Sequence, residues 1–263
     1  MDVLRPHSLD EALRLRSEVP AARVIQGGTD VMVEVNAGHS RPEAFLDLSG
    51  VDELRGWSRD GGTLVLGAGL TYAELLRSEV ATALPALAEA SRTVGSPQIR
   101  SRGTIGGNLG TASPAGDALP PLRIEGAMVD VASVRGERTL PLGEFTTGPK
   151  RTALASDELI VRVRVDAGGR PQTFLKVGRR NAMVISVCSL ALVADRERGE
   201  VRAAYGSAGP VVGLVTAPLE DADAFPDAVA AAASPIDDIR GSAAYRRHAL
   251  RVLTRRALAR CLA

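Results

Sequence analysis

A short glycine-containing segment near the N-terminus has the composition of an anion-binding loop. Residues 26–30 read Gln-Gly-Gly-Thr-Asp and begin at the last residue of 22–26, which predict a short buried strand. Glycines allow a ligand to approach the backbone closely, and successive N–H groups with the Thr29 hydroxyl could form a concave anion site. The same residues also fit a tight turn from a strand to a helix, in which Asp30 is only a cap. This segment alone is compatible with both interpretations.

A second glycine-rich stretch carries more information. Residues 103–109 read Gly-Thr-Ile-Gly-Gly-Asn-Leu, and residues 113–117 read Ser-Pro-Ala-Gly-Asp. Residues 106–108 are small or conformationally permissive, which suits the close approach of a pyrophosphate. Asp117 accepts hydrogen bonds when ionised and could bind ribose hydroxyls, as acidic residues do in dinucleotide sites. We expect both stretches to be loops. The alternative for the second is a mobile surface loop without a ligand, and neither stretch matches the Gly-x-Gly-x-x-Gly pattern of a Rossmann site.

The composition argues against several other chemistries. The chain has 263 residues, 45% hydrophobic and 24% charged, which is typical of a globular protein of about two domains. The 32 basic and 31 acidic residues leave a net charge of +1, which argues against a nucleic-acid-binding surface. Two distant cysteines, Cys188 and Cys261, cannot hold a [2Fe–2S] cluster, and the three scattered histidines have no zinc-site spacing. No Gly-x-Ser-x-Gly elbow or P-loop is present.

The hydropathy pattern contains no membrane signal. No apolar run approaches the roughly 20 residues that span a bilayer. Residues 1–6 lack the apolar core of a signal peptide. We therefore expect a cytoplasmic protein with neither a membrane nor a nucleic acid as partner.

Local signals predict several helices. Capping boxes at residues 8–11 and 71–74 predict helices that begin there, the second extending to about Thr82. Residues 31–35 could open a helix after the first glycine segment, and Pro85 suits the first position of another. The clearest helix is C-terminal. Its apolar face includes Cys261, so we expect this cysteine to pack in the core. That face contains Tyr245, Ala249, Val252, Leu253, Ala257, Leu258, Cys261 and Leu262.

Apolar runs predict strands between these helices. The tight connection at residues 195–200 predicts that the last two strands form an antiparallel hairpin. The polar, turn-rich residues 166–171 are the best candidate for a domain boundary. The expected strands are residues 22–26, 63–66, 127–133, 159–165, 173–177, 184–194 and 201–207.

Taken together, these segments resemble the FAD-binding (medium) subunit of the molybdenum hydroxylases, the family of xanthine dehydrogenase and carbon monoxide dehydrogenase. The double glycine pattern with the later Asp117 is the specific part of the resemblance, which covers nearly the whole chain. The segments that carry it are residues 24–30, 104–108, 113–117, 153–165, 174–183 and 242–247.

Two positions depart from the family pattern. The family often has Arg-Asn before the Gly-Thr of the second stretch, where residues 100–102 here read Arg-Ser-Arg. Many members have an aspartate after the Arg-Arg-Asn-Ala segment, where residues 183–186 here read Met-Val-Ile-Ser. The second departure leaves the electron acceptor of the flavin open.

The resemblance implies an α+β fold in two domains. Residues 1–166 would form a two-part FAD-binding domain of the PCMH (vanillyl-alcohol-oxidase) type, with subdomains of about residues 1–56 and 57–166. Residues 167–263 would form a C-terminal domain made of an antiparallel sheet plus a helix.

The resemblance also implies FAD as the cofactor, with no metal and no catalytic side chain in this chain. Residues 24–31 would wrap the FAD pyrophosphate and residues 104–108 would complete the cradle. Asp117 would bind the ribose or ribityl region, Ile160 would pack near the isoalloxazine, and Lys176 would lie close to the polar edge of the flavin; without the resemblance, Lys176 could equally be a solvated strand residue. The implied cofactor-binding residues are Val24, Ile25, Gln26, Gly27, Gly28, Thr29, Asp30, Val31, Thr104, Ile105, Gly106, Gly107, Asn108, Asp117, Ile160 and Lys176.

The function implied is electron transfer within an oxidoreductase complex. The chain would pass electrons from the [2Fe–2S] clusters of a partner subunit through FAD to NAD, a quinone or oxygen, in a xanthine dehydrogenase-like enzyme. A molybdopterin-binding large subunit would complete a heterotrimer, and two heterotrimers would form a dimer. The alternatives are a stand-alone PCMH-type flavin reductase, similar to UDP-N-acetylenolpyruvoylglucosamine reductase, and a scaffold subunit that has lost its flavin.

Overall fold

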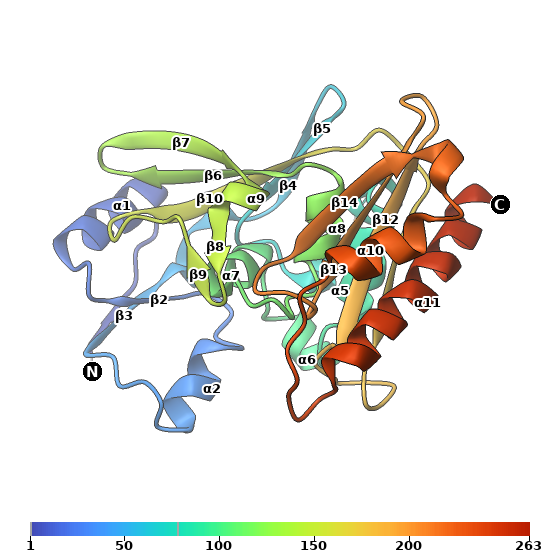
Figure 1. The fold of residues 1–263 in the computed structure, drawn as a ribbon. Coiled ribbons are helices and arrows are strands. Elements are labelled where there is room, and N and C mark those ends of the chain that lie inside the picture. The colour runs from blue at the N-terminus through green and yellow to red at the C-terminus, as the bar shows by residue number, and fades with distance from the viewer. Residues whose placement is uncertain (1, 78) are drawn as a thin grey trace.

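A small parallel sheet forms the N-terminal part of the computed structural model, which describes residues 2–77 and 79–263 (Figure 1). Its strands lie in the order β1 (Asp2–Leu4), β3 (Ala44–Asp47) and β2 (Arg23–Ile25). Helix α1 (Leu9–Glu18) is capped by the hydroxyl of Ser8, as predicted, and α2 (Val31–Asn36) follows the first glycine segment. The 3₁₀ turns η1 (Leu48–Gly50) and η2 (Asp52–Leu54) lead to the next sheet.

The second sheet is antiparallel, and its central strand is the last to be added along the chain. In sheet order the strands are β4 (Trp57–Asp60), β5 (Thr63–Gly67), β10 (Leu159–Asp166), β6 (Met128–Ser133) and β7 (Gly136–Pro141). Strand β10 packs Leu159 and Val161 against the N-terminal core, whereas Ile160 and Val163 join the core of the middle of the molecule. Alternation places Leu159 and Ile160 on opposite faces of the sheet, and the register shift between Ile160 and Arg162 moves Val163 to the face of Ile160, so the strand contributes to two cores at once.

Short helices fill the region between β5 and β10. They are α3 (Tyr72–Leu75), α4 (Val80–Ala83), α5 (Pro85–Thr93), α6 (Pro97–Arg100), α7 (Ile105–Thr111), α8 (Leu119–Ile124) and α9 (Leu142–Phe145), with the small hairpin β8 (Thr146–Gly148) and β9 (Arg151–Thr152).

The single helix expected from Thr71 to about Thr82 is wrong. The capping box at Thr71 is present, but α3 ends at Leu75 and α4 begins at Val80; residue 78, which the prediction covered, lies outside the described residues. Leu75 and Val80 are both buried, and a spacing of five residues would not place them on one face of a continuous helix. The capping box set where the helix begins, whereas the core decided where it ends.

The C-terminal part is a four-stranded antiparallel meander. It contains β11 (Gln172–Val177), β12 (Cys188–Asp195), β13 (Glu200–Gly206) and β14 (Gly213–Pro218), followed by η3 (Leu219–Asp221), α10 (Phe225–Ala232) and α11 (Ala243–Leu262). The predicted hairpin is confirmed, because Asp195 pairs with Glu200 at its turn. The strand expected from residue 184 begins only at Cys188. Residues 184–187 instead belong to a loop in which the Ser186 hydroxyl bonds to Asp117.

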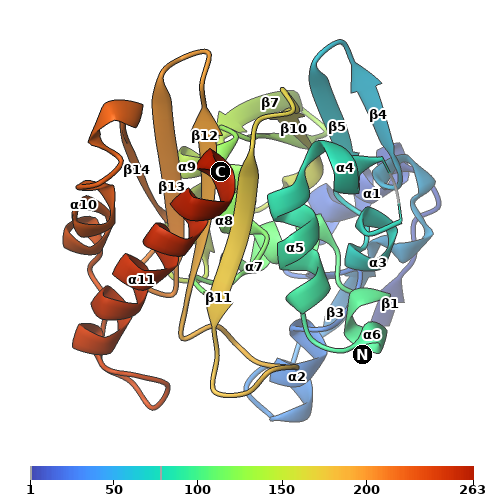
Figure 2. The ribbon, with the colours of Figure 1, turned by 90° about the vertical axis from the view of Figure 1, so that its right-hand side faces the viewer.

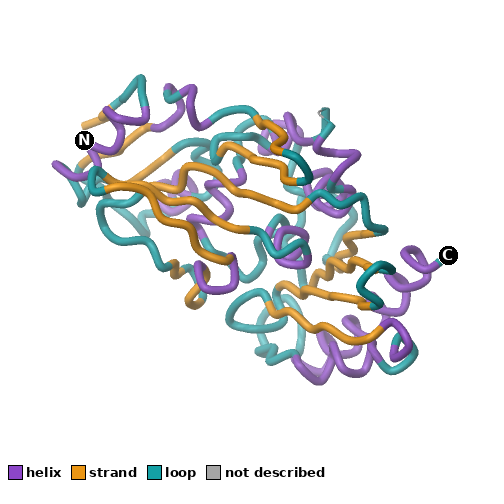
Figure 3. Tube along the Cα trace, turned by 90° about the horizontal axis from the view of Figure 1, so that it is seen from above, coloured by secondary structure: helices purple, strands orange, loops and turns teal. Residues whose placement is uncertain are grey.

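Helices cover this sheet on both faces, as Figure 2 shows for α11 on one side and α5 and α8 on the other. Accordingly, Leu190 and Leu192 of β12 pack with α11, while Ala191 and Val193 join the core of the preceding part. Figure 3 shows the strands of this sheet as a group separate from the five-stranded sheet. The α+β class is therefore confirmed. The division at residue 166 stays a prediction, since the cores on its two sides are continuous.

Helix α11 buries most of its predicted apolar face, including Cys261. Burial raises the pKa of the Cys261 thiol to about 11 and that of Cys188 to about 12, so both cysteines are packing residues. The expectation for Tyr245 is wrong, because its side chain is 47% exposed. Arg246 is buried instead and donates hydrogen bonds to the Ser207 carbonyl and the Asp238 carboxylate. Among the described residues, no helix combines the length and the apolar character that a bilayer crossing requires.

Candidate functional site

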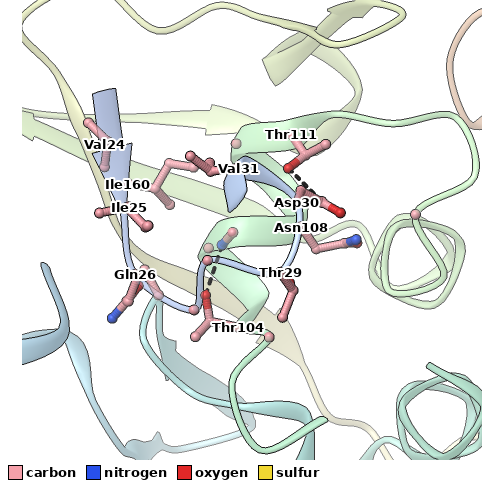
Figure 4. A pocket seen from close by; sticks show the side chains of 18 of the residues that line it. Val24, Ile25, Gln26, Thr29, Asp30, Val31, Thr104, Asn108, Thr111 and Ile160 are labelled. Atoms are coloured by element: carbon pink, nitrogen blue, oxygen red, sulfur yellow. Dashed lines mark hydrogen bonds between the residues drawn. The ribbon is translucent and has the colours of Figure 1, made fainter. Parts of the chain in front are cut away.

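A cavity of about 660 Å³ lies where the two glycine stretches meet, within the size range of cofactor sites. Figure 4 shows β2 and the segment after it on one side, with α7 beside them. All of the residues expected to bind a cofactor line this cavity except Ile105 and Lys176. Residues 183–185, from the loop between β11 and β12, also contribute to its wall.

The first glycine segment carries unpaired backbone donors. An added Cβ at Gly27 would lie 2.0 Å from the carbonyl oxygen of Arg102, and Gly28 has a φ of +75°, so both positions favour glycine. The backbone N–H groups of residues 27–31 donate no hydrogen bond to any part of the chain that the structure describes. Successive free N–H groups in a turn form a concave site for an anion.

Asp30 joins the two glycine stretches instead of capping α2. It occupies the N-cap position, but its side chain makes no capping hydrogen bond. Its Oδ2 accepts a hydrogen bond of 2.9 Å from the hydroxyl of Thr111, at the end of α7 (Figure 4). The interpretation of Asp30 as a simple helix cap is therefore wrong, and the residue holds the first segment against α7.

Residues 105–109 of the second glycine stretch begin helix α7, so the expectation of a loop is wrong there, whereas residues 113–117 do form a loop. Thr104 is the N-cap of α7, and the Thr104 hydroxyl accepts a hydrogen bond of 3.0 Å from the Gly107 N–H. The N–H groups of Ile105 and Gly106 donate to the carbonyl oxygens of Leu70 and Ala68, respectively. Because these amides already have partners, the stretch has few free donors to offer an anion.

Glycine in α7 instead provides an open surface. An added Cβ at Gly106 would lie 2.7 Å from Ala68, so packing demands glycine there. At Gly107 it would approach, among the described atoms, only the Thr104 hydroxyl at 3.1 Å, and at Gly110 only Ile160 at 3.6 Å. Gly107 and Gly110 are both exposed and line the cavity. The protein itself does not need glycine at these two positions, whereas a ligand lying on the helix would.

Asp117 and Lys176 form a buried ion pair. Lys176 Nζ lies 2.6 Å from Asp117 Oδ2 and also donates to the carbonyl oxygens of Thr93 and Val184, so all three of its N–H groups have partners. The Ser186 hydroxyl donates to Asp117 Oδ1 at 2.7 Å. Burial raises the pKa of the Asp117 carboxyl, and Lys176 opposes this rise. Asp117 lines the cavity, whereas Lys176 does not. Lys176 instead holds Asp117 and the 183–186 loop in place through its hydrogen bonds to Asp117 and Val184.

Apolar side chains line another part of the cavity. Figure 4 shows Ile160 close to Val24 and Ile25 of β2, with Val31 of α2 on the same side. The pairing of β10 with β6 shifts register directly after Ile160, which marks a bulge. Bulges re-aim side chains near functional sites, and here the side chain of Ile160 lies at the cavity while Val161 packs in the N-terminal core.

Comparison with known proteins decides the family of this chain. Residues 1–166 match the family model described as the FAD binding domain in molybdopterin dehydrogenase. The chain belongs to this family. It is 28% identical to the xanthine dehydrogenase FAD-binding subunit of Escherichia coli O157:H7, covering 98% of this chain and 95% of that subunit. It is 32% identical to the nicotine 6-hydroxylase medium subunit of Paenarthrobacter nicotinovorans, covering 96% and 94%, respectively.

The fold of this molybdopterin dehydrogenase family member matches a solved relative closely. A chain of the carbon monoxide dehydrogenase of Hydrogenophaga pseudoflava superposes with a TM-score of 0.93 at 28% identity, covering 100% of this chain and 97% of that one. The resemblance predicted from sequence is therefore confirmed. The protein is an FAD-binding subunit of the molybdenum hydroxylase family and part of an oxidoreductase.

Several residues that line the cavity of this FAD-binding chain were missed from the sequence. Gly110 and Thr111 follow Gly107 by three and four residues, so a helical interpretation of the stretch would have placed them on the same face. Tyr72 and the 183–185 segment had no local signal, because tertiary contacts alone bring them to the cavity. Further lining residues include Arg16, Ala68, Val94, Gly95, Ile99, Leu154 and Glu158.

Glu158 is expected to make the stability of this FAD-binding chain depend on pH. Arg138 donates to both oxygens of its carboxylate, at 2.6 and 2.7 Å, and this holds the pKa of Glu158 below its ordinary value. A lowered folded-state pKa means that the pair stabilises the fold above about pH 4.5 and that this contribution disappears as the pH falls through the lowered value. Between about pH 6 and pH 3 we expect the wild type to lose on the order of 1 kcal/mol more unfolding free energy than Glu158→Gln. Urea titrations that give parallel pH profiles for the two proteins would contradict this.

Proposed function

We propose that FAD lies in the 660 Å³ cavity with its diphosphate at the free N–H groups of residues 27–31. This run of unpaired donors is the observation that carries the proposal, because a doubly charged anion needs several fixed donors. The open face of α7 at Gly107 and Gly110 would allow the same group to lie close to the helix backbone. Asp117 would accept hydrogen bonds from hydroxyls of the cofactor, and Ile160 would pack against one of its rings.

A buried polar atom without a partner supports this placement. Asn108 Oδ1 is buried and accepts no hydrogen bond from any described residue. An added Cβ at Gly116 would lie 2.9 Å from that oxygen, so the Asn108 amide sits beside the segment that carries Asp117. Since buried polar groups almost always have partners, a ligand hydroxyl between Asn108 and Asp117 would complete the site.

The chain would act as an electron carrier between partners. FAD supplies the ability to accept and release electrons, and the protein orients it and controls its surroundings. Relatives are named as medium subunits or medium chains of nicotine 6-hydroxylase and carbon monoxide dehydrogenase, which supports a complex with other subunits. We assign the [2Fe–2S] clusters and the molybdopterin to separate partner subunits, in a dimer of heterotrimers. The outgoing electrons would pass to NAD, a quinone or oxygen, as in a xanthine dehydrogenase-like enzyme.

Anaerobic reduction tests the need for partners. The isolated chain, loaded with FAD, is mixed in turn with xanthine, nicotine and carbon monoxide, while the visible absorbance of the flavin is followed. We expect none of the three to bleach it, because this chain would receive electrons only through a docked iron–sulfur partner. Dithionite serves as the control that the bound flavin can be reduced. Bleaching by one of the three substrates would instead support a self-sufficient flavin enzyme.

NADH added in the same experiment tests whether NAD is the electron acceptor of the reduced flavin. Reduction of the flavin by NADH alone would reverse the proposed exit step and would favour NAD as the acceptor. A chain that binds no FAD at all would support the scaffold alternative.

A further inference from the structure

Tyr72 lines the cavity and carries a buried hydroxyl without a partner among the described residues. The residue is only 3% exposed, and its Oη makes no hydrogen bond with any described residue. Yet Tyr72 lines the same cavity as the two glycine stretches. An unpaired hydroxyl in the interior costs about 1–3 kcal/mol, whereas phenylalanine would fill the same space without that cost.

The backbone holds the Tyr72 ring beside the start of α7. The N–H of Tyr72 donates a hydrogen bond of 3.1 Å to the carbonyl oxygen of Gly103. Gly103 directly precedes Thr104, the N-cap of α7. An added Cβ at Gly103 would lie 3.2 Å from ring atoms of Tyr72, so this glycine leaves room for the ring. Both contacts are with Gly103 and hold Tyr72 beside the start of α7, and neither of them gives the hydroxyl a partner.

The electrostatic surroundings determine how this hydroxyl can act. Burial, and after it the negative charges of Asp117 and Asp30, raise the pKa of Tyr72 above its ordinary value. The phenol therefore stays protonated at neutral pH and has a hydrogen to donate. The Asp30 carboxylate also lines the cavity and would repel a ligand anion, so a diphosphate there needs neutral donors in addition to the backbone N–H groups.

We propose that the Tyr72 hydroxyl donates a hydrogen bond to a diphosphate oxygen of FAD, as a side-chain donor that complements the backbone donors of residues 27–31. This inference rests on the placement of FAD proposed above. The ring lies next to the N-terminal turn of α7, where that placement puts the diphosphate.

The test compares Tyr72→Phe with Tyr205→Phe. Tyr205 is also buried, but its hydroxyl donates to the Ala232 carbonyl at 2.7 Å, and neither of these two residues lines the cavity. For Tyr72→Phe we expect the dissociation constant of FAD, measured by flavin fluorescence, to rise about tenfold or more, as for a hydrogen bond to a charged group. The thermal stability of its FAD-free form should be unchanged or higher, since an unpaired polar atom is removed. Tyr205→Phe should show the opposite pattern: lower stability and unchanged FAD affinity.

Phosphorus-31 NMR tests whether the diphosphate of FAD accepts the hydrogen bond from Tyr72. The resonances of bound FAD should shift between the wild type and Tyr72→Phe, because the variant removes a donor to the diphosphate. An FAD affinity of Tyr72→Phe within twofold of the wild type, or phosphorus resonances identical to those of the wild type, would overturn the inference. If the wild type itself binds no FAD, the placement of the cofactor fails as well, so the two failures are distinguishable.

A measurement on the wild-type chain does not depend on whether Tyr72→Phe folds. The chain has three tyrosines, so labelling with 3-fluorotyrosine yields three fluorine-19 signals. Tyr205→Phe and Tyr245→Phe identify two of them, and the third belongs to Tyr72. FAD should shift the Tyr72 signal, and a signal that stays in place on saturation with FAD would overturn the inference.

Discussion

Valine at position 107 is expected to abolish FAD binding while the fold is retained. Gly107 is exposed on the face of α7 that lines the cavity, and an added Cβ there would meet, among the described atoms, only the Thr104 hydroxyl. The two methyl groups of valine would therefore extend into the space proposed for the cofactor. Gly107 is helical and has no positive φ, so the expected effect of valine on FAD binding is steric.

The expected loss for Gly107→Val is more than about 100-fold in FAD affinity, because several contacts of the diphosphate would be lost together. Flavin fluorescence during titration with FAD measures this directly, and circular dichroism of the FAD-free protein checks the fold. Gly107→Ala gives a graded comparison: it should weaken FAD less, and it should stabilise α7 by up to about 1 kcal/mol through helix propensity.

Gly62→Val is the matched control for Gly107→Val. Gly62 lies in the turn between β4 and β5, with no described atom within 4 Å of an added Cβ and without a positive φ. This variant should bind FAD like the wild type. A Gly107→Val protein that keeps a full complement of FAD would show that the cofactor does not lie against α7.

Methionine in place of Lys176 is expected to cost about 3–5 kcal/mol of unfolding free energy. The side chains of Lys176 and Asp117 are only 8% and 9% exposed, so removing the lysine leaves a buried carboxylate without its counter-charge. The substitution also frees the carbonyl oxygens of Thr93 and Val184, which Lys176 connects. Urea unfolding of the FAD-free protein at neutral pH measures the loss.

The only other lysine of the chain provides the control for Lys176→Met. Lys150 pairs with Glu34 at 2.9 Å, but its side chain is 63% exposed, so Lys150→Met should cost less than about 1 kcal/mol. The double variant Lys176→Met/Asp117→Asn should recover part of the stability lost in Lys176→Met, because it removes the uncompensated charge. Equal losses for Lys150→Met and Lys176→Met would argue that the buried pair contributes nothing particular to the fold.

The sequence by itself determined the local features of this protein. Capping residues predicted where α1 and α3 begin, since an N-cap depends only on residues within one turn. The short connection at residues 195–200 predicted the β12–β13 hairpin, because it is too short for anything but antiparallel pairing. The two glycine stretches with Asp117 predicted the family and the walls of the cavity, since close approach of a ligand to the backbone requires those residue types nearby.

Tertiary structure decided everything that depends on partners distant in the sequence. Leu70 and Ala68 accept the first N–H groups of α7, and this turned the second glycine stretch into a helix with an open face instead of a loop. Lys176 reaches Asp117 across 59 positions of the chain, which made it a positioning residue behind the cavity instead of part of its lining. Tyr72 and Gly110 came to the cavity by the same packing. A side chain acquires its role from the burial and the charges around it, and these are set only when segments far apart in the chain are brought together.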